Sequence, residues 1–175
     1  HEIIDTQIFD LAGEKIRKNS SFCSFFSRMR RGYLYTTALE QGYNKVALGH
    51  HLDDAMESYF MNLFYNGTMR TMPPIYKASN GLEVIRPLIF CRERQLRAFA
   101  DSNEIRVIGD EACPGLRFDV KMPHARATTK ELLAKLEEQN PKIFVSMKAA
   151  FSNIQLPTFF YKDLKDIKLN LQEDE

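Results

Sequence analysis

The sequence predicts an α/β domain with a mainly parallel sheet and flanking helices. Amphipathic helical segments alternate with short apolar runs along the chain, which is typical of this fold class. Residues that favour turns, such as Gly, Pro and Asn, bound the apolar runs and keep them to strand length. The chain has 175 residues, of which 44% are hydrophobic, so it is long and apolar enough for one domain with a buried core.

The first half of the chain contains the clearest elements. Residues 2–9 alternate loosely between apolar and polar side chains, which predicts a half-buried strand. Residues 27–41 have apolar positions at helical spacing and predict a helix. A short apolar strand is expected over 45–48, followed at once by a helix that ends at Asn66 and Gly67.

The second half continues the alternation. Its expected elements are a loop followed by a turn within 68–81, a strand over 82–85, a helix over 91–102, a strand over 105–108 and two helices within 128–152, interrupted by Asn140-Pro141. The charged end of the chain is expected to be a loosely held tail.

Composition excludes several classes of protein. No apolar run approaches the roughly 20 residues that a membrane span needs, so we expect no contact with a membrane. The 24 basic and 23 acidic residues nearly cancel, so any binding of nucleic acid must come from local patches. The 3 cysteines are too few for a disulfide scaffold, which favours a cytoplasmic location.

The most informative motif is LGHHLDDAMES at 48–58, where a predicted strand runs into a predicted helix. Ligands bind beyond the carboxyl ends of strands in open parallel sheets. Paired carboxylates suit Mg²⁺ together with substrate phosphates, and imidazoles suit donation to phosphate oxygens or proton transfer. The candidate residues at this junction are Gly49, His50, His51, Asp53 and Asp54.

Simpler roles exist for each of these residues alone. An aspartate in the first turn of a helix offsets the helix dipole by roughly 0.3–1 kcal/mol without any function. A histidine can satisfy a backbone carbonyl. The paired imidazoles and carboxylates lie within positions 50–54, which favours a functional site. The same side chains would also suit a metal-dependent phosphohydrolase.

Motifs in the same order resemble the PP-loop family of ATP-dependent tRNA-modifying enzymes, and within it the tRNA 2-thiocytidine synthetases. CSFFSRMRRG resembles the family's CSxCSRLRRG, and GHHLDDAMES resembles its GHHxDDxxET. The MPP and IRPL segments follow in the family's order. The resemblance implies a Rossmann-like fold of the adenine nucleotide alpha hydrolase type. It divides the chain into the C-terminal portion of a PP-loop domain (1–125) and a helical extension with a charged tail (126–175).

The activity implied by this resemblance is 2-thiolation of a tRNA cytidine. ATP adenylates the base oxygen, and sulfur from a donor protein or sulfide then displaces AMP. The implied cofactors are ATP and Mg²⁺, and the implied partners are tRNA, the sulfur donor and a second copy of the chain in a homodimer. The implied catalytic residues are Asp53, Asp54, Cys23 and Cys113, and the implied cofactor-binding residues are Gly49, His50 and His51.

The family's phosphate-binding SGGxDS loop is not found before Cys23. The sequence therefore begins about where the family's third strand would begin, and the N-terminal strand–loop–helix portion is missing. Because that loop grips the phosphates, we expect this polypeptide alone to bind ATP weakly or not at all. The chain would be an ATP-dependent tRNA sulfurtransferase if the intact protein carries the loop. The alternative is a diverged, non-catalytic member that binds nucleotide or RNA.

The family's cysteine pattern is also incomplete. Phe26 and Asp110 stand where the pattern has cysteines of an iron–sulfur site. Because clusters need thiolates, Cys23 and Cys113 alone are too few for a four-iron cluster. These two cysteines are equally well explained as small, partly buried apolar residues.

Basic residues crowd the helix that follows Cys23. The candidates for RNA binding are Arg28, Arg30 and Arg31, which lie beside aromatic residues. Arginine forks suit phosphate, and aromatic rings stack on unpaired bases. A second cluster comprises Arg86, Arg92, Arg94, Arg97 and Arg106. A solvated helix face is the simpler explanation for both clusters.

Overall fold

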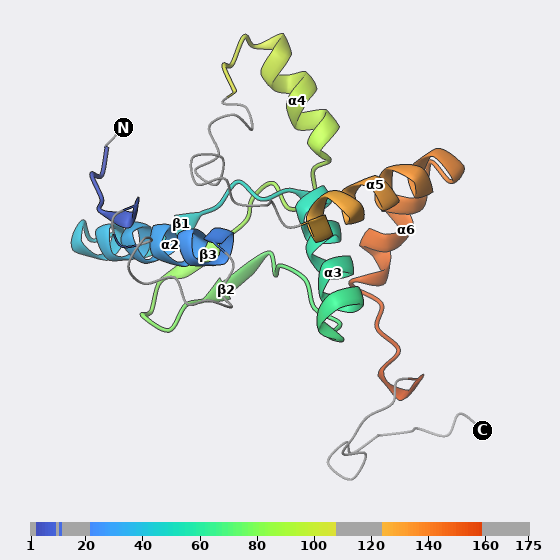
Figure 1. The fold of residues 1–175 in the computed structure, drawn as a ribbon, viewed down its shortest axis with the longest axis horizontal. Helices are drawn as coiled ribbons and strands as arrows, with labels where there is room; N and C mark the ends of the chain where they lie inside the picture. The colour runs from blue at the N-terminus through green and yellow to red at the C-terminus, as the bar shows by residue number, and fades with distance from the viewer. Residues whose placement is uncertain (1–2, 10, 12–21, 108–123, 159–175) are drawn as a thin grey trace.

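The computed structural model describes residues 3–9, 11, 22–107 and 124–158 (Figure 1). Its elements in chain order are α2 (Phe22–Glu40), β1 (Lys45–Ala47), α3 (Leu52–Asn66), β2 (Ile75–Lys77), β3 (Glu83–Ile85), α4 (Glu93–Ser102), α5 (His124–Gln139), α6 (Ile143–Ala150) and the 3-10 turn η3 (Leu156–Thr158). In Figure 1, α2 lies along the sheet, α3 lies between the sheet and the α5–α6 pair, and α4 projects away from both.

The described sheet has three strands in the order β1-β3-β2. β1 and β3 are parallel, with Val46 opposite Val84, whereas β2 and β3 are antiparallel, with Tyr76 opposite Val84. Because β1 and β3 run in the same direction, their carboxyl ends share one edge of the sheet. The α/β fold class is therefore confirmed, with one parallel and one antiparallel pair among the described strands.

Two apolar clusters hold these layers together. Ala38 of α2, Val46 of β1 and Leu82 beside β3 form the cluster between α2 and the sheet. The second cluster joins α3 to the helices that follow, and its buried members are Leu52, Met56, Leu133 and Phe144. Burial of one such side chain stabilises the fold by about 1.5–3 kcal/mol. The α5–α6 pair is thus packed on α3, the helix that follows residues 50–54, which we call the HHxDD turn. The boundary expected at residue 125 stays a prediction.

Local sequence explains where α3 begins and ends. His51 is its N-cap, and the Nδ1 atom of His51 accepts a hydrogen bond from the backbone N–H of Asp54 at 3.3 Å. The Asp54 carboxylate accepts in return from the backbone N–H of His51 at 3.0 Å, which completes a capping box. Gly67 ends the helix in the left-handed conformation, with φ of 60°, which glycine adopts without steric cost.

Three local predictions are wrong. β2 lies within the segment expected to be a loop, because Ile75–Lys77 finds backbone partners in β3. The turn expected at Asn80-Gly81 is present and connects β2 to β3, with Gly81 at a φ of 93°. Residues 3–7 form no strand, and a helical turn follows at Ile8 and Phe9. Residues 105–107 also form no strand. Such short apolar segments become strands only when another strand offers backbone partners, and local periodicity does not contain that information. Among the described helices, none is long and apolar enough to cross a membrane.

Candidate functional site

A cavity of about 1080 Å³ opens at the carboxyl ends of the parallel strands. Leu48 and His50 come directly after β1, and Arg86 comes directly after β3. All three line the cavity, which therefore lies at the edge of the sheet where ligands bind in open parallel sheets. Its other polar and aromatic lining residues are Thr6, Phe9, Phe26, Ser27, Arg30, Arg31, Tyr33, Ser58, Arg70, Thr71 and Tyr76.

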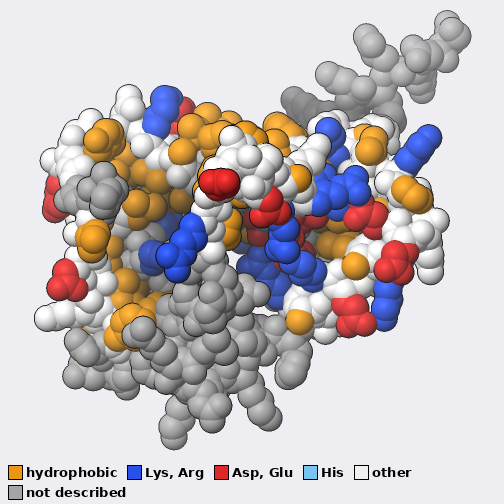
Figure 2. All heavy atoms as spheres, turned by 90° about the horizontal axis from the view of Figure 1, so that it is seen from above, with side chains coloured by type: hydrophobic (Ala, Val, Ile, Leu, Met, Phe, Trp, Pro, Cys, Tyr) orange, Lys and Arg blue, Asp and Glu red, His pale blue; other side chains and the backbone are white. Residues whose placement is uncertain are grey.

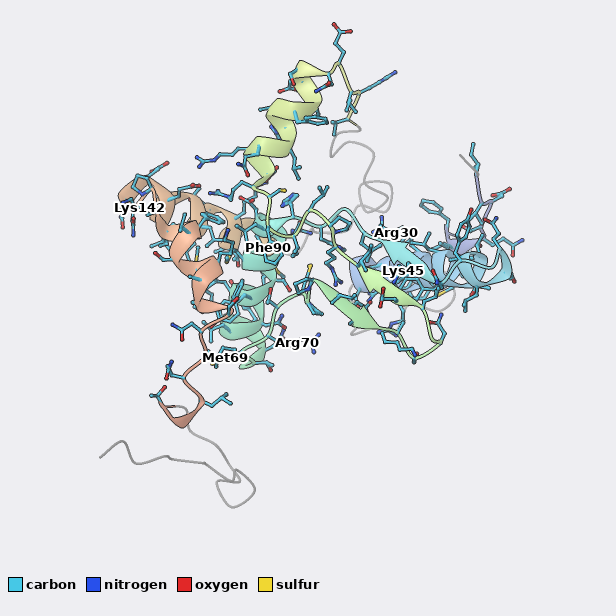
Figure 3. All side chains as sticks on the ribbon, turned by 180° about the vertical axis from the view of Figure 1, so that it is seen from behind. Arg30, Lys45, Met69, Arg70, Phe90 and Lys142 are labelled. Atoms are coloured by element: carbon cyan, nitrogen blue, oxygen red, sulfur yellow. The ribbon has the colours of Figure 1, made fainter. Side chains whose placement is uncertain are left out.

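The charge of the cavity wall has one sign. Arg30 and Arg31 come from α2, Arg70 from the segment after α3, and Arg86 from the end of β3. The described lining contains no aspartate or glutamate. Figure 3 labels Arg30 on α2 and Arg70 on the segment between α3 and β2. A concave wall with several guanidinium groups and no carboxylate attracts anions, and phosphate most of all.

Arg86 is the most deeply buried of these arginines, with 9% of its surface exposed. Its Nη1 atom donates to the carbonyl oxygen of Pro73 at 2.6 Å, and its Nε donates to Nδ1 of His50 at 3.4 Å. Its guanidinium carbon lies 5.3 Å from the centre of the Tyr76 ring. Burial, followed by the charge of Arg86, lowers the pKa of His50, so His50 is neutral at physiological pH.

A pair of tyrosines supports the same wall. The hydroxyl groups of Tyr35 and Tyr76 lie 2.9 Å apart and share a hydrogen bond. Burial and this hydrogen bond raise the pKa of Tyr35 to about 12, so its hydroxyl stays protonated. Tyr76 thereby joins α2 to the Arg86 side chain.

The first aspartate of the HHxDD turn is tied to α4. Both carboxylate oxygens of Asp53 accept from Nε of Arg92, at 3.1 and 3.2 Å. The Asp53 carboxylate also accepts from the backbone N–H of Glu93 at 2.7 Å, which caps the start of α4. The Asp53 side chain is only 14% exposed. Its hydrogen bonds thus join α3 to the start of α4, and its other described polar contact is with Nδ1 of His51 at 3.8 Å.

Arg92 also connects these elements to α5 and α6. Its Nη1 and Nη2 atoms donate to the two carboxylate oxygens of Glu137, at 2.6 and 2.8 Å. Its guanidinium carbon lies 3.4 Å above the centre of the Phe144 ring. The hydrogen bonds from Arg92 lower the pKa of Glu137 below its ordinary value. Figure 2 shows basic and acidic side chains gathered side by side on one face of the molecule.

The second aspartate of the turn pairs with α5. Nη2 of Arg126 donates to Asp54 at 2.6 Å, and Nε of Arg126 donates to Glu57 at 2.7 Å. Glu57 is buried, with 4% of its surface exposed. Burial alone would lower the pKa of Arg126, but its bonds to Glu57 and Asp54 outweigh burial and raise it. The buried glutamate is therefore paired with an arginine that stays charged.

These contacts decide whether the paired carboxylates fit Mg²⁺. Each carboxylate is occupied by a different arginine, and the two arginines come from different parts of the chain. Neither aspartate lines the strand-end cavity. In the part of the chain that the structure describes, no group of three or more His, Cys, Asp and Glu side chains is arranged to hold a metal ion. The described arrangement therefore does not fit Mg²⁺ on Asp53 and Asp54.

The other candidate residues fall in different places. His51 caps α3 and does not line the cavity; Arg28 is exposed on α2, also outside the lining. Gly49 is exposed, and a Cβ built on it would meet no atom within 4 Å, so the backbone there is open to a ligand. Of the residues that the sequence singles out, the cavity brings together His50, Arg30 and Arg31 with Arg86 of the second arginine cluster.

The cysteine positions are described only in part. Phe26, at the position of an expected cysteine, packs edge to face on Phe9 with ring centres 4.9 Å apart. It offers no atom to bind iron, so this position does not fit a cluster. The side chain of Cys23 lies outside the described part of the structure, as do Cys113 and Asp110 entirely.

Sequence reasoning missed several residues that build this region. Arg70, Tyr76, Arg126 and Glu137 were not singled out. The contacts of Arg126 and Glu137 join residues 69, 72 and 45 positions apart in the chain. No local pattern signals such pairs, because they arise only when α5 packs against α3 and the start of α4.

The sheet and its arginine-lined cavity define an α/β domain with a positively charged cavity at the strand ends. A model of the PP-loop domain matches residues 11–121. The chain therefore belongs to the PP-loop domain family, which confirms the resemblance in its motifs.

The most informative relatives share one activity in their names. The tRNA-cytidine(32) 2-sulfurtransferase of Geobacter metallireducens is 41% identical over 157 residues, which cover 89% of this chain and 59% of the relative. The enzyme of the same name from Pseudomonas syringae pv. syringae is 36% identical over 176 residues, which cover 100% of this chain and 62% of the relative. The chain thus spans about three-fifths of the length of these curated relatives.

One solved structure has the same fold. The U34-tRNA thiolase NcsA from Methanococcus maripaludis, solved with its [4Fe-4S] cluster, aligns with a TM-score of 0.64 and 21% identity. The alignment covers 93% of this chain and 52% of that chain. This likeness supports the α/β assignment of the described elements.

Proposed function

We propose that the full protein catalyses ATP-dependent 2-thiolation of a tRNA cytidine, and that the strand-end cavity binds the reacting parts of both substrates. The relatives named for this activity match nearly the whole chain. The observation that carries the proposal is the cavity wall, which places several arginines and His50 together without a carboxylate. Such a wall suits the phosphates of ATP and of tRNA, whereas a neutral substrate would not need it.

The proposed reaction has two steps. The base oxygen of the cytidine attacks the α-phosphorus of ATP, a P–O bond forms, and pyrophosphate leaves. A sulfur nucleophile from a donor protein or sulfide then attacks the base carbon, and AMP leaves with the oxygen. Negative charge grows on the phosphate oxygens in the first step. Arg30, Arg31 and Arg86 would stabilise that charge without forming a covalent bond to the substrate.

Mg²⁺ enters this proposal with ATP. Mg²⁺ keeps several of its waters and is bound largely through substrate phosphates. The paired aspartates contribute by holding α4 and α5 against the HHxDD turn. In this interpretation Asp53 and Asp54 have a structural role, because they position the cavity wall, and they are not catalytic residues. The cytoplasmic location and the homodimer stay predictions.

The test is the thionucleoside content of tRNA. Cells lacking the gene should lose 2-thiocytidine, measured by mass spectrometry of digested tRNA, and the full-length gene should restore it. A gene with both Arg30→Gln and Arg31→Gln should restore much less. If deletion leaves 2-thiocytidine unchanged while the purified protein still binds tRNA, the protein is a non-catalytic RNA-binding member of the family and the proposal fails.

A further inference from the structure

The contact between Arg86 and His50 determines which nitrogen of the His50 ring carries the proton. A guanidinium group has only donors, so its Nε can approach a ring nitrogen only when that nitrogen is an acceptor. The nitrogen that faces Nε of Arg86 is Nδ1 of His50, at 3.4 Å. In a neutral imidazole one nitrogen accepts and the other carries the proton, so the proton of His50 must lie on Nε2.

We infer that Arg86 is a positioning residue that holds His50 as a neutral imidazole with its proton on Nε2. His50, which lines the cavity, then has its N–H donor at Nε2, while its acceptor Nδ1 is occupied by Arg86. A neutral donor suits an oxygen that gains negative charge during a reaction, because it stabilises the charge without delivering a full proton. This use of the donor rests on the proposed function, whereas the tautomer itself does not.

The packing around Arg86 makes the arrangement rigid. Its Nη1 atom is anchored on the carbonyl of Pro73 at 2.6 Å, and its guanidinium lies over the ring of Tyr76. Its position directly after β3 fixes the start of the side chain relative to His50, which follows the neighbouring strand β1. The guanidinium is therefore held from both sides while it donates to Nδ1.

Other charges around His50 do not alter this conclusion. Arg126 and Arg30 act in the same direction as Arg86 and disfavour a protonated ring, whereas Asp54 acts in the opposite direction. Burial and Arg86 outweigh Asp54 in that balance. Arg30 lines the same cavity without a described hydrogen bond to His50, which makes it a matched control for charge without contact.

The experiment is a long-range ¹H–¹⁵N NMR titration of the full-length protein between about pH 5 and pH 8, without ATP or tRNA. Signals of His50 are assigned by their loss in His50→Gln. In the wild-type protein we expect Nδ1 unprotonated and Nε2 protonated at neutral pH, with a pKa below the ordinary 6.5. A proton on Nδ1, or a charged ring at neutral pH, would overturn the inference even if the variants below do not fold.

Two variants separate contact from charge. Arg86→Met removes the donor but keeps the stem of the side chain, so the proton should be shared between the two ring nitrogens and the pKa of His50 should rise. Arg30→Met removes a charge from the same cavity but should leave the tautomer as in the wild type. Equal behaviour of the two folded variants would refute the role of Arg86. Thiolation is measured separately, so the proposed reaction can fail while the tautomer is confirmed, and the reverse.

Discussion

Arg92 and Asp53 form an ion pair that connects the HHxDD turn to the helices that follow it. Nε of Arg92 lies 3.1 and 3.2 Å from the two carboxylate oxygens of Asp53, and Nη2 of Arg92 lies 3.1 Å from Oδ1. The same guanidinium binds Glu137 through two parallel hydrogen bonds. One side chain thereby connects α3, α4 and α5.

Loss of the ion pairs that Arg92 forms with Asp53 and Glu137 should destabilise the fold. Arg92→Ala leaves Asp53 and Glu137 without their shared partner, and both carboxylates are largely shielded from water, with 14% and 23% of the side chain exposed. We expect a loss of about 3 kcal/mol in the free energy of unfolding, measured with urea. Arg94→Ala is the control, because Arg94 is exposed and 3.7 Å from Glu137. Arg94→Ala should lower the free energy of unfolding by less than about 0.5 kcal/mol. If Arg92→Ala and Arg94→Ala lower it equally, the ion pairs of Arg92 do not hold these helices together.

The stability contributed by Glu137 should depend on pH. The pKa of Glu137 is depressed in the folded state from its ordinary 4.5. Its contribution is therefore complete above 4.5 and is lost as the pH falls below that value through the folded pKa. Glu137→Gln should be less stable than the wild type at neutral pH, and the gap should close in strong acid. The exposed neighbour Glu138 provides the control, since Glu138→Gln should cost less than about 0.5 kcal/mol at neutral pH. A gap for Glu137→Gln that persists in acid would count against the ion pair.

Arg126 and Glu57 should be coupled. Arg126→Ala leaves the buried Glu57 carboxylate without its partner, and we expect a cost of about 2 kcal/mol. In a Glu57→Gln background the same substitution should cost about 1 kcal/mol less, which a double-mutant cycle measures. Lys130→Ala removes an exposed pair with Glu93 and should have little effect. Additive losses for Arg126 and Glu57 would contradict the coupling.

RNA binding should depend on position within α2. Arg30 and Arg31 line the cavity, whereas Arg28 on the same helix does not. Arg30→Gln with Arg31→Gln should weaken tRNA binding and lower the slope of log K against log salt by about 1 for each phosphate that the protein no longer neutralises. Filter binding at several salt concentrations measures both quantities. An equal effect of Arg28→Gln would place the RNA-binding surface on the exposed helix face and not in the cavity.

The helices and the strand ends were within reach of the sequence. The apolar spacing in α3 and α4 and the Asn140-Pro141 interruption are local signals, and the helices occur near where those signals put them. β2 was not predictable in this way, because a three-residue strand depends on its partner β3 and not on its own periodicity.

The sequence motifs predicted which residues lie near the cavity, but not which partners their side chains contact. The sequence placed His50 at the ligand edge and drew attention to the arginines of α2, and both line the cavity. It could not show that Asp53 and Asp54 are each paired with an arginine 39 and 72 positions away. Pairs so distant in the chain are fixed by helix packing. The local sequence around the two aspartates would be the same if they bound a metal ion.

Formation of AMP by the purified full-length protein tests the central claim most directly. With ATP, tRNA and sulfide, the wild-type protein should release pyrophosphate and form AMP, and it should form neither when tRNA is left out. The Arg30→Gln and Arg31→Gln double variant should lose most of that activity while keeping its thermal stability. AMP formation that is independent of tRNA, or that survives loss of both arginines, would contradict the assignment of this cavity to tRNA activation.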